Sequence, residues 1–420
     1  MTTDKARLVA RELSERMLAG KSDGANETVA VAMSGGVDSS VTAALMSNCG
    51  YKVIGMTMRV WSAPAEDQEN CCVRRTEIAV EAARQVAGEL GIPHYVVDLQ
   101  DEFREIVVNE FCKEYLRART PNPCVICNSR IKFGVLMRHA RQLGADWLAT
   151  GHYARVKYDS GSGRYLLLKG VDARRDQSYV LYRLTQAQLS RAIFPLGYYE
   201  KREVRALAKD LGLSVADRSE SREICFIPDD DYRRFLRRYA CALADADEAA
   251  CSGGRCSRKG NIVTIDGDVL GTHQGIENYT VGQRKGLGIA SARRKYVVGI
   301  DPETCSVVVG DEADLYSSEL VASNCNWISI EKPWDCMKAS AKIRYSFQPV
   351  DVTVFTNPDD ETRVRIVFDE PVRAVTPGQA VVLYDGDVVL GGGTIEKAIR
   401  VAGAEKSLKG AAQTASKHHP

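Results

Sequence analysis

A short strand, a glycine-containing turn and a helix follow one another near the start of this chain. The apolar run Thr28–Met33 predicts a buried strand, and residues 39–47 predict a helix. Residues 34–40 between them read Ser-Gly-Gly-Val-Asp-Ser-Ser. Two glycines let the backbone turn tightly and bring its N–H groups close to an anion, and the N-terminus of a helix favours phosphate. The segment therefore predicts a phosphate site between a strand and a helix.

The same alternation continues along the chain. Further strands are predicted at residues 51–58, 94–99 and 147–150, and further helices at 76–90, 101–119 and 131–143. Strands that alternate with helices favour a parallel sheet covered on both faces. The predicted fold class is α/β, with a nucleotide-binding parallel sheet followed by two small β-rich domains.

The length and a change of pattern indicate several domains. A chain of 420 residues is too long for one ordinary core. From Asn261 onward, the segments are short, β-branched and separated by turns. We predict a catalytic domain over residues 25–237, a central β-rich module over 238–301 and a C-terminal β-barrel-like domain over 302–400. Residues 401–420 are rich in Ala, Lys, Ser and Gly, and we expect them to be disordered.

Composition limits the cellular compartment and the classes of partner that we expect for this chain. The net charge of +1 neither indicates nor excludes a nucleic-acid partner. No stretch approaches the roughly 20 apolar residues of a membrane helix, and the first 21 residues lack the apolar core of a secretory signal. We therefore expect a cytoplasmic protein without a membrane partner. In that setting, the 13 cysteines indicate thiol chemistry, metal binding or burial rather than structural disulfides.

The turn at residues 34–40 has further features of a nucleotide site. Asp38 could hold a Mg²⁺ ion that bridges phosphates, and Ser39 adds a hydroxyl donor. The loop lacks the Gly-Lys-Ser/Thr ending of a kinase-type P-loop, so none of its residues is a lysine that could neutralise a γ-phosphate. Met58, at the end of the second strand, could lie against an adenine or could belong to the core.

Two cysteines stand in a proline-containing loop. Cys124-Val125-Ile126-Cys127 follows Pro121 and Pro123, and we predict that the thiols lie ahead of a helix that starts near Ile131. A helix N-terminus lowers the pKa of a thiol and makes it a better nucleophile. A third cysteine, Cys225, follows about 100 residues later. Taken alone, each is more often a buried structural thiol than a catalytic one.

The order of the motifs resembles that of the tRNA-specific 2-thiouridylases, a family of the ATP-pyrophosphatase superfamily. The resemblance spans roughly Val29–Ile395. The matching segments are residues 34–40, 120–133, 150–153, 176–179, 224–227, 282–288 and 376–379.

The resemblance implies a fold, a reaction and partners. The fold is that of the adenine-nucleotide α-hydrolases, and the two β-rich modules, residues 238–301 and 302–400, would both bind tRNA. ATP, with Mg²⁺, adenylates O2 of the wobble uridine (U34) of tRNAs for Lys, Glu and Gln, and a persulfide sulfur displaces AMP. Cys127 corresponds to the nucleophile and Cys225 to the persulfide carrier, and the pair would end as a disulfide. The sulfur donor would be a cysteine desulfurase or a sulfur-relay protein, and a monomer is the default expectation.

The resemblance also implies binding residues. The residues expected to contact ATP are Ala32, Met33, Ser34, Gly35, Gly36, Val37, Asp38, Ser39, Met58 and Gly151. The residues expected to contact tRNA are Asn122, Pro123, Cys124, His152, Arg175, Asp176, Gln177, Arg344, Tyr345 and Gln379. His152 would touch the base or cap its loop.

Cys124 departs from the family pattern, because many members carry Asp at this position. It could be a substitute thiol or an extra resolving thiol. Alternatively, Cys124, Cys127 and Cys225 could bind a [4Fe–4S] cluster with one open iron site. Three other cysteines, Cys241, Cys251 and Cys256, fit no standard zinc spacing and are interpreted as free surface thiols, and Cys71-Cys72 has no assigned role.

Two other functions remain open at this stage. One is an amidotransferase-type ligase of the same fold, which would need no paired cysteines. The other is a non-catalytic protein that binds tRNA or a nucleotide, which would be expected to have lost Asp38 or the thiols. Basic clusters would suit RNA phosphates, although each alone is more often a solvated face. They are Arg233-Arg234, Arg237-Arg238, Arg284-Lys285 and Arg293-Arg294-Lys295.

Overall fold

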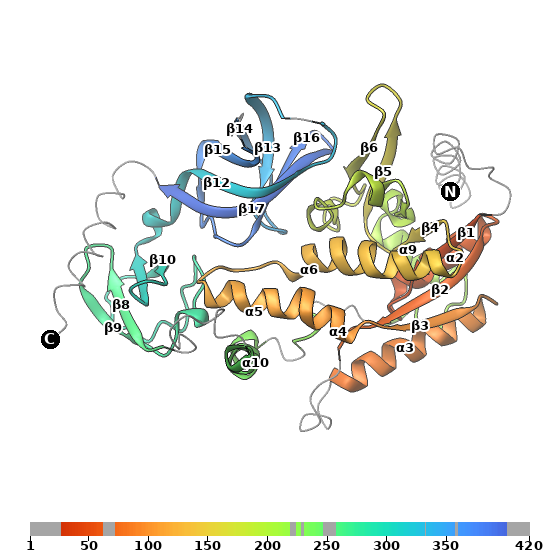
Figure 1. Cartoon of the computed structure of the whole chain (residues 1–420), viewed down its shortest axis with the longest axis horizontal. Helices are drawn as coiled ribbons and strands as arrows, with labels where there is room; N and C mark the ends of the chain where they lie inside the picture. The colour runs from red at the N-terminus through yellow and green to blue at the C-terminus, as the bar shows by residue number, and fades with distance from the viewer. Residues whose placement is uncertain are drawn as a thin grey trace.

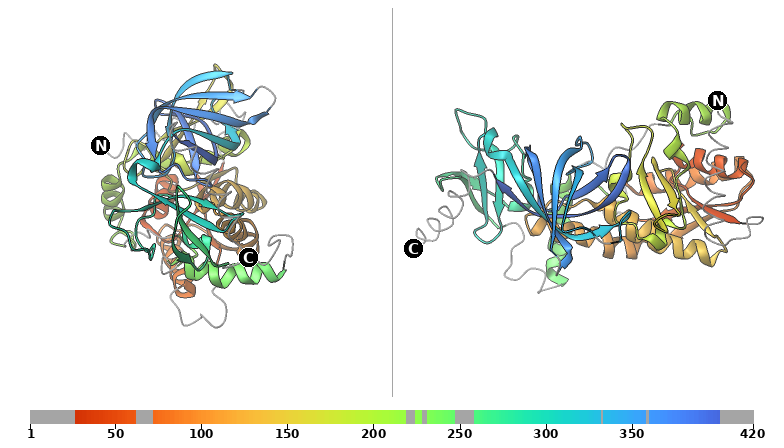
Figure 2. Two further views of the ribbon diagram at one scale, coloured as in Figure 1. Left: turned by 90° about the vertical axis from the view of Figure 1, so that its left-hand side faces the viewer. Right: turned by 90° about the horizontal axis from the view of Figure 1, so that it is seen from above.

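The structure is a computed structural model that describes residues 27–61, 72–218, 224–227, 231–246, 258–331, 333–357 and 360–400. It has three parts in a row: a parallel sheet with helices at one end, a β-barrel in the middle and a small four-stranded sheet at the other end (Figures 1 and 2). The predicted fold class is confirmed. The predictions for residues 401–420 and for Cys71, Cys251 and Cys256 lie outside the described residues, as do the side chains of Cys72 and Cys241.

The parallel sheet has the strand order β3-β2-β1-β4-β7. Its strands are β1 (Thr28–Ala32), β2 (Lys52–Arg59), β3 (His94–Asp98), β4 (Trp147–Ala149) and β7 (Ala192–Ile193). Alternation along β1 explains the layers, because Val29 and Val31 belong to one core cluster and Ala30 to another. Both faces are therefore covered, as the sequence predicts. The covering helices include α2 (Val37–Asn48), α3 (Cys72–Glu89) and α9 (Lys201–Asp210).

Two long helical runs lead from β3 toward β4, and both contain π-helical segments. The first consists of α4 (Gln100–Phe103), η2 (Arg104–Val108) and α5 (Asn109–Leu116), and the second of α6 (Pro123–Ile126), η3 (Cys127–Leu136) and α7 (Met137–Gln142). The second run starts at Pro123, so the predicted start near Ile131 is wrong. Proline suits the first helical position because its φ is preset and its missing N–H needs no partner there.

The small sheet has the order β10-β11-β8-β9. Its strands are β8 (Gly260–Thr264), β9 (Val269–His273), β10 (Tyr296–Asp301) and β11 (Ser306–Gly310), and helix α10 (Tyr232–Ala246) precedes it in the chain. Short helical turns connect the main elements. They are η4 (Ser178–Val180), α8 (Gln186–Leu189), η5 (Pro195–Tyr198), η6 (Ile276–Asn278) and η7 (Glu312–Leu315).

The barrel closes because its first strand also pairs with its last. Its order is β12-β15-β14-β13-β16-β17, and β12 pairs with β17. The strands are β12 (Tyr316–Trp327), β13 (Cys336–Lys342), β14 (Val350–Asn357), β15 (Asp360–Arg373), β16 (Ala380–Asp385) and β17 (Val388–Arg400). The hairpin β5 (Ala154–Asp159) and β6 (Arg164–Lys169) extends this sheet through β17, which ties the barrel to the first part of the chain. Among the described residues, no helix is long and apolar enough to cross a membrane.

Candidate active site

The Ser34–Ser40 segment lies at the C-terminal edge of the parallel sheet and leads from β1 into the first turn of α2. Gly35 has φ +67°, and a side chain there would overlap the carbonyl oxygen of Ala79 in α3. The hydroxyl of Ser39 accepts a hydrogen bond from the Ser34 amide at 3.1 Å and lies 3.1 Å from the carbonyl oxygen of Gly36, to which it donates. The loop is thus fixed by its own side chains and by the approach of α3.

Strand order explains why distant residues meet at this loop. The chain adds β2 and β3 on one side of β1 and β4 and β7 on the other, so β1 stands at the point where the order reverses. Ligands of open α/β sheets bind at such points, outside the carboxyl ends of the strands. Ala32 and Met33 enter the loop from β1, and Met58 lies near the end of β2. Gly151 follows β4, and a Cβ atom on it would lie 3.0 Å from the Cβ of Asp38.

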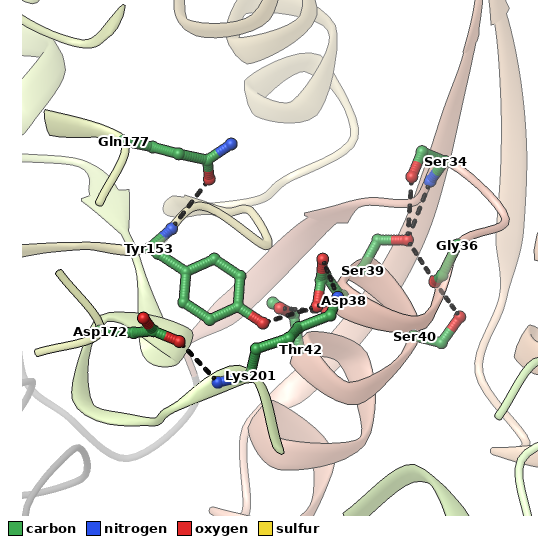
Figure 3. A network of polar contacts seen from close by, with 10 residues as sticks. All are labelled: Ser34, Gly36, Asp38, Ser39, Ser40, Thr42, Tyr153, Asp172, Gln177 and Lys201. Atoms are coloured by element: carbon green, nitrogen blue, oxygen red, sulfur yellow. Dashed lines mark hydrogen bonds and ion pairs between the residues drawn. The ribbon is translucent and has the colours of Figure 1, made fainter. Parts of the chain in front are cut away.

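Asp38 is held by two residues from other parts of the chain (Figure 3). Lys201 Nζ lies 2.7 Å from Oδ1 and 2.8 Å from Oδ2 of Asp38, and the Tyr153 hydroxyl donates to Oδ1 at 2.8 Å. Lys201 begins α9, and its side chain is only 10% exposed. The tertiary structure therefore places a lysine, Lys201, beside a loop that has no lysine in its own sequence. Spacing along the sequence gives no signal for it.

A second cation reaches the loop backbone. Arg218 Nη1 donates to the Gly35 carbonyl oxygen at 2.7 Å. Together with Lys201, this guanidinium brings positive charge to the turn where the sequence predicts phosphate. Both residues were missed by the sequence analysis.

Three thiols meet at the start of the second helical run. Cys124 lies in the first turn of α6, Cys127 begins η3, and Cys225 comes from a separate segment. Burial raises the pKa of Cys225, and Cys127 and Cys124 raise it further, so the three thiols lie within electrostatic reach of one another. The structure thus brings together the three cysteines singled out by sequence.

Burial has the largest effect on the pKa values of these three thiols, and it raises all of them. It raises the pKa of Cys127 to about 11, and it raises the pKa of Cys225 and of Cys124 above the ordinary value. Cys124 and Cys225 are exposed residues, yet the surrounding protein removes enough water from their thiols to disfavour the charged form. The prediction of helix-lowered pKa values is therefore wrong. Cys124 and Cys127 lie inside the helical run rather than ahead of it, and desolvation outweighs any effect of its N-terminus.

Lys132 is the cation of this thiol site. Its charge lowers the pKa of Cys124, Cys127 and Cys225, against the larger effect of burial. It stands five residues after Cys127 within η3, and the i to i+5 hydrogen bonds of a π-helix bring such residues onto neighbouring positions. Because the π-helical turn is not visible in the sequence, Lys132 was missed there.

Lys132 and His152 connect the thiol site to the nucleotide loop. His152 follows Gly151, which touches Asp38, and Lys132 lowers the pKa of His152 in addition to the larger effect of burial. The imidazole is 7% exposed, its Nδ1 lies 2.6 Å from the Thr150 hydroxyl, and it packs against the ring of Phe133. A buried imidazole with a strongly lowered pKa is neutral. His152 therefore fits a packing and capping role between the two sites.

The barrel holds the loop that presents Cys124. Gln379 Nε2 donates to the carbonyl oxygens of Thr120 at 2.9 Å and Pro121 at 3.3 Å. The Thr120 amide donates to the Pro377 carbonyl oxygen at 2.8 Å. Gly378 has φ +91°, and a Cβ atom there would lie 2.7 Å from the Thr120 nitrogen. The amide group expected to contact tRNA thus positions the thiol loop.

The other residues expected to contact tRNA lie in two settings. Tyr345 is 42% exposed, and burial, then Asp176, raises its pKa, with smaller effects from Arg175 and Cys124. This places it close to the thiol site. Asp176, in contrast, is 6% exposed, and its Oδ1 accepts hydrogen bonds from the amides of Gly170 at 3.2 Å and Ser178 at 3.0 Å.

Gln177 and Arg344 also make contacts within the protein. Gln177 Oε1 accepts from the Tyr153 amide at 3.0 Å, and Arg344 Nη2 donates to the Arg373 carbonyl oxygen at 3.1 Å. Asn122 occupies the N-cap position of α6 without a side-chain cap, and Pro123 is buried. The contacts of these residues with RNA stay predictions.

The sequence left open a cluster held by the three thiols. Across the described ranges, no group of three or more His, Cys, Asp or Glu side chains is arranged to hold a metal ion. The arrangement of Cys124, Cys127 and Cys225 therefore gives no support to the cluster alternative.

Comparison with known proteins identifies the family. The chain matches the family models described as "tRNA methyl transferase HUP domain" over residues 27–229, "tRNA methyl transferase PRC-barrel domain" over 254–311 and "Aminomethyltransferase beta-barrel domain" over 317–395. Among solved structures, an NMN synthetase from Francisella tularensis is 16% identical with a TM-score of 0.35, over 58% of this chain and 87% of that one.

Two curated relatives are much more similar. "tRNA-specific 2-thiouridylase MnmA 1" of Caldanaerobacter subterraneus subsp. tengcongensis is 52% identical over 89% of this chain and 99% of its own length. "tRNA-specific 2-thiouridylase MnmA" of Carboxydothermus hydrogenoformans is 48% identical over 88% and 97%. This chain therefore belongs to the family of tRNA-specific 2-thiouridylases.

Proposed function

We propose that this enzyme uses ATP to replace O2 of the wobble uridine (U34) with sulfur in tRNAs for Lys, Glu and Gln. The observation that carries the proposal is the continuity between two sites. Gly151 touches Asp38 of the nucleotide loop, and the next residue, His152, lies within the electrostatic reach of Lys132 beside the thiols. One uridine could therefore meet both the α-phosphate of ATP and a sulfur atom.

The first step would be adenylation. The uridine O2 attacks the α-phosphate, the bond to the β-phosphate breaks, and pyrophosphate leaves. The loop amides, the hydroxyl of Ser34 and the ammonium of Lys201 are suited to bind pyrophosphate. Asp38 is the carboxylate that would hold Mg²⁺, which supplies neutralising charge to the phosphates when bound. Lys201 now occupies both of its oxygens, so ion and lysine would share or exchange this carboxylate.

The second step would transfer sulfur. A cysteine desulfurase or a sulfur-relay protein would first load Cys225 as a persulfide. The Cys127 thiolate attacks the Cys225 sulfur, a disulfide forms between them, and hydrosulfide is released. Hydrosulfide adds to C2 of the adenylated uridine and expels AMP, which leaves 2-thiouridine. Because burial raises the pKa of Cys127, the nearby ammonium of Lys132 has the role of stabilising its thiolate.

Cys124 lies beside both reacting thiols. An extra resolving thiol could attack the Cys127–Cys225 disulfide, whereas a substitute for the usual Asp would act on protons. The variant Cys124→Asp separates these roles. If the residue handles protons, the variant should keep both single-turnover thiolation and reductive recycling. If the thiol resolves the disulfide, single-turnover thiolation should persist and reductive recycling should slow.

The test is nucleoside mass analysis of tRNA after incubation with ATP and a sulfur donor. Cys127→Ser and Cys225→Ser should each abolish 2-thiouridine while ATP binding persists, and Cys336→Ser, at an exposed thiol in β13, should not. Retained thiolation in Cys225→Ser would remove that residue as the sulfur carrier. Incorporation of ammonia in place of sulfur would instead favour an amidotransferase-type ligase.

A further inference from the structure

Lys201, which holds Asp38, is itself held by a segment from another part of the chain (Figure 3). Oδ2 of Asp172 accepts a hydrogen bond from the Lys201 amide at 3.0 Å. Lys201 is the first residue of α9, so this amide is one of the N–H groups that have no partner inside the helix. A carboxylate at this end also interacts favourably with the helix dipole. Asp172 therefore fixes the main chain from which the Lys201 side chain reaches Asp38.

Asp172 is fixed in turn by the hydrogen bonds around it. Its Oδ1 accepts from the Arg174 amide at 3.1 Å, and its carbonyl oxygen accepts from the Arg175 amide at 3.0 Å. The preceding residue, Val171, donates its amide to the Gly197 carbonyl oxygen at 3.0 Å. One carboxylate oxygen of Asp172 thus belongs to its own turn, and the other belongs to α9.

Tyr153, the second residue that holds Asp38, is held by the other end of the same segment (Figure 3). The Gln177 amide donates to the Tyr153 carbonyl oxygen at 2.9 Å, and Gln177 Oε1 accepts from the Tyr153 amide at 3.0 Å. The Tyr153 hydroxyl then donates to Asp38 Oδ1 at 2.8 Å. Residues 172–177 therefore position the backbone of both side chains that converge on Asp38.

The segment 172–177 also borders the thiol site. Burial, then Asp176, raises the pKa of Tyr345, and Asp172 adds a smaller effect. Cys124 acts on the same hydroxyl, so Tyr345 lies within electrostatic reach of the segment and of a thiol. A uridine that meets the thiols, as the proposed function requires, would therefore lie beside residues 172–177.

Lys201 has two alternative anions at the nucleotide loop. In the structure, its ammonium contacts both carboxylate oxygens of Asp38. Bound ATP would bring phosphates to the same loop, and these would compete with Asp38 for the ammonium. The balance between the two anions depends on where the main chain of Lys201 is held, because that position sets the reach of the side chain. It therefore depends on Asp172.

We propose that Asp172 is a positioning residue for the adenylation step and that it couples the binding of tRNA to the binding of ATP. RNA at the thiol site would restrain residues 172–177, and with them Lys201 and Tyr153, so less ordering would be left for ATP to impose. Each ligand would then strengthen the binding of the other by the same factor. The inference rests on the proposed function in taking tRNA and ATP as the two ligands.

The test measures the Kd of α,β-methylene-ATP, in which the bond broken by adenylation is replaced, with and without saturating unmodified tRNA for Glu. In the full-length wild type, tRNA should lower this Kd about tenfold. Asp172→Ala removes the acceptor of the Lys201 amide, so tRNA should lower the Kd by about twofold or less. Asp172→Asn keeps a carbonyl-type acceptor and should retain most of the effect of tRNA.

Asp159→Ala is the matched control. The Asp159 carboxylate also accepts hydrogen bonds within a turn, from the amide of Ser162 at 3.0 Å and from its hydroxyl at 2.6 Å. In the part of the chain that the structure describes, this carboxylate makes no hydrogen bond to the nucleotide loop or to α9. Asp159→Ala should therefore keep the full effect of tRNA on the Kd.

Three results would overturn the inference: tRNA could leave the wild-type Kd unchanged, the nucleotide could leave the wild-type Kd for tRNA unchanged, or tRNA could keep its full effect in Asp172→Ala. In the last case the variant would weaken nucleotide binding equally with and without tRNA, as a purely structural role predicts. The wild-type comparison needs no variant, so it holds whatever the stability of Asp172→Ala. Because no sulfur is transferred in this assay, absence of thiolation by the wild type would count against the proposed function alone.

Discussion

Lys201 Nζ contacts both carboxylate oxygens of Asp38, at 2.7 Å and 2.8 Å, although the two residues are 163 positions apart in the chain. The pair places a lysine at a phosphate-type loop that has none in its own sequence. The lysine side chain is almost fully buried, and Asp38 compensates its charge there.

Replacing Lys201 should therefore weaken ATP binding. Lys201→Met leaves Asp38 uncompensated beside the phosphates, and a lost charged hydrogen bond of about 1.5–3 kcal/mol corresponds to a roughly ten- to hundredfold rise in the Kd for ATP. Lys209→Met is the control, because Lys209 lies on the same helix with its side chain 62% exposed. Calorimetric titration with ATP and with AMP would check this, and an equal loss for both nucleotides would argue against a role at the outer phosphates.

Gly151→Ala should disturb the same loop by contact. The added Cβ would lie 3.0 Å from both the carbonyl carbon and the Cβ of Asp38, and overpacking of this kind costs about 1–3 kcal/mol. ATP binding and thermal stability should both decrease. Gly88→Ala provides the contrast, because a Cβ there meets nothing within 4 Å in helix α3, and this substitution should stabilise the protein by about 0.5–1 kcal/mol. Unchanged ATP affinity in Gly151→Ala would show that Asp38 and the first turn of α2 can move away from the added methyl group without loss of the ATP site.

The reactivity of Cys127 should depend steeply on pH. With a pKa of about 11, only a small fraction of the thiol is ionised at neutral pH. Because only the thiolate is alkylated, the rate of iodoacetamide modification should rise about tenfold per pH unit from pH 7 and level off near pH 11. Peptide mass spectrometry of the Cys127 peptide measures this, and a plateau below pH 9 would contradict the assigned environment.

Lys132→Met should shift that profile to higher pH. Removing the ammonium takes away the charge that favours the thiolates of Cys127 and Cys225, so alkylation at a fixed pH should slow. Arg130→Met, at an exposed residue of the same helix, is the matched control. Equal profiles for the two variants would mean that Lys132 does not act on the thiols.

Gln379 should matter for the thiol loop even without tRNA. Its amide donates to the carbonyl oxygens of Thr120 and Pro121, so Gln379→Glu places an acceptor opposite two acceptors. We expect a loss of about 1–3 kcal/mol in Gln379→Glu, and a smaller loss in Gln379→Ala. Hydrogen exchange at residues 117–122 and the melting temperature would test this. Unchanged exchange in both variants would restrict Gln379 to contacts with RNA.

The sequence alone determined the α/β class, the phosphate-type loop and the three cysteines. These depend on short-range patterns: a continuous apolar strand, two glycines before a helix, and a cysteine pair that follows two prolines. The predicted strands at residues 51–58 and 94–99 agree with β2 and β3 to within one residue at each end. Such features can be recognised in a single sequence because each is required by the local backbone geometry of a few neighbouring residues.

Only the tertiary structure decided how these parts work together. The helix start at Pro123, the π-helical turn that brings Lys132 toward Cys127, and the approach of Lys201 to Asp38 all depend on packing between distant segments. Burial is also a property of the whole fold. It reversed the expected direction of the thiol pKa values, because the loss of hydration destabilises a thiolate more than a nearby helix N-terminus stabilises it.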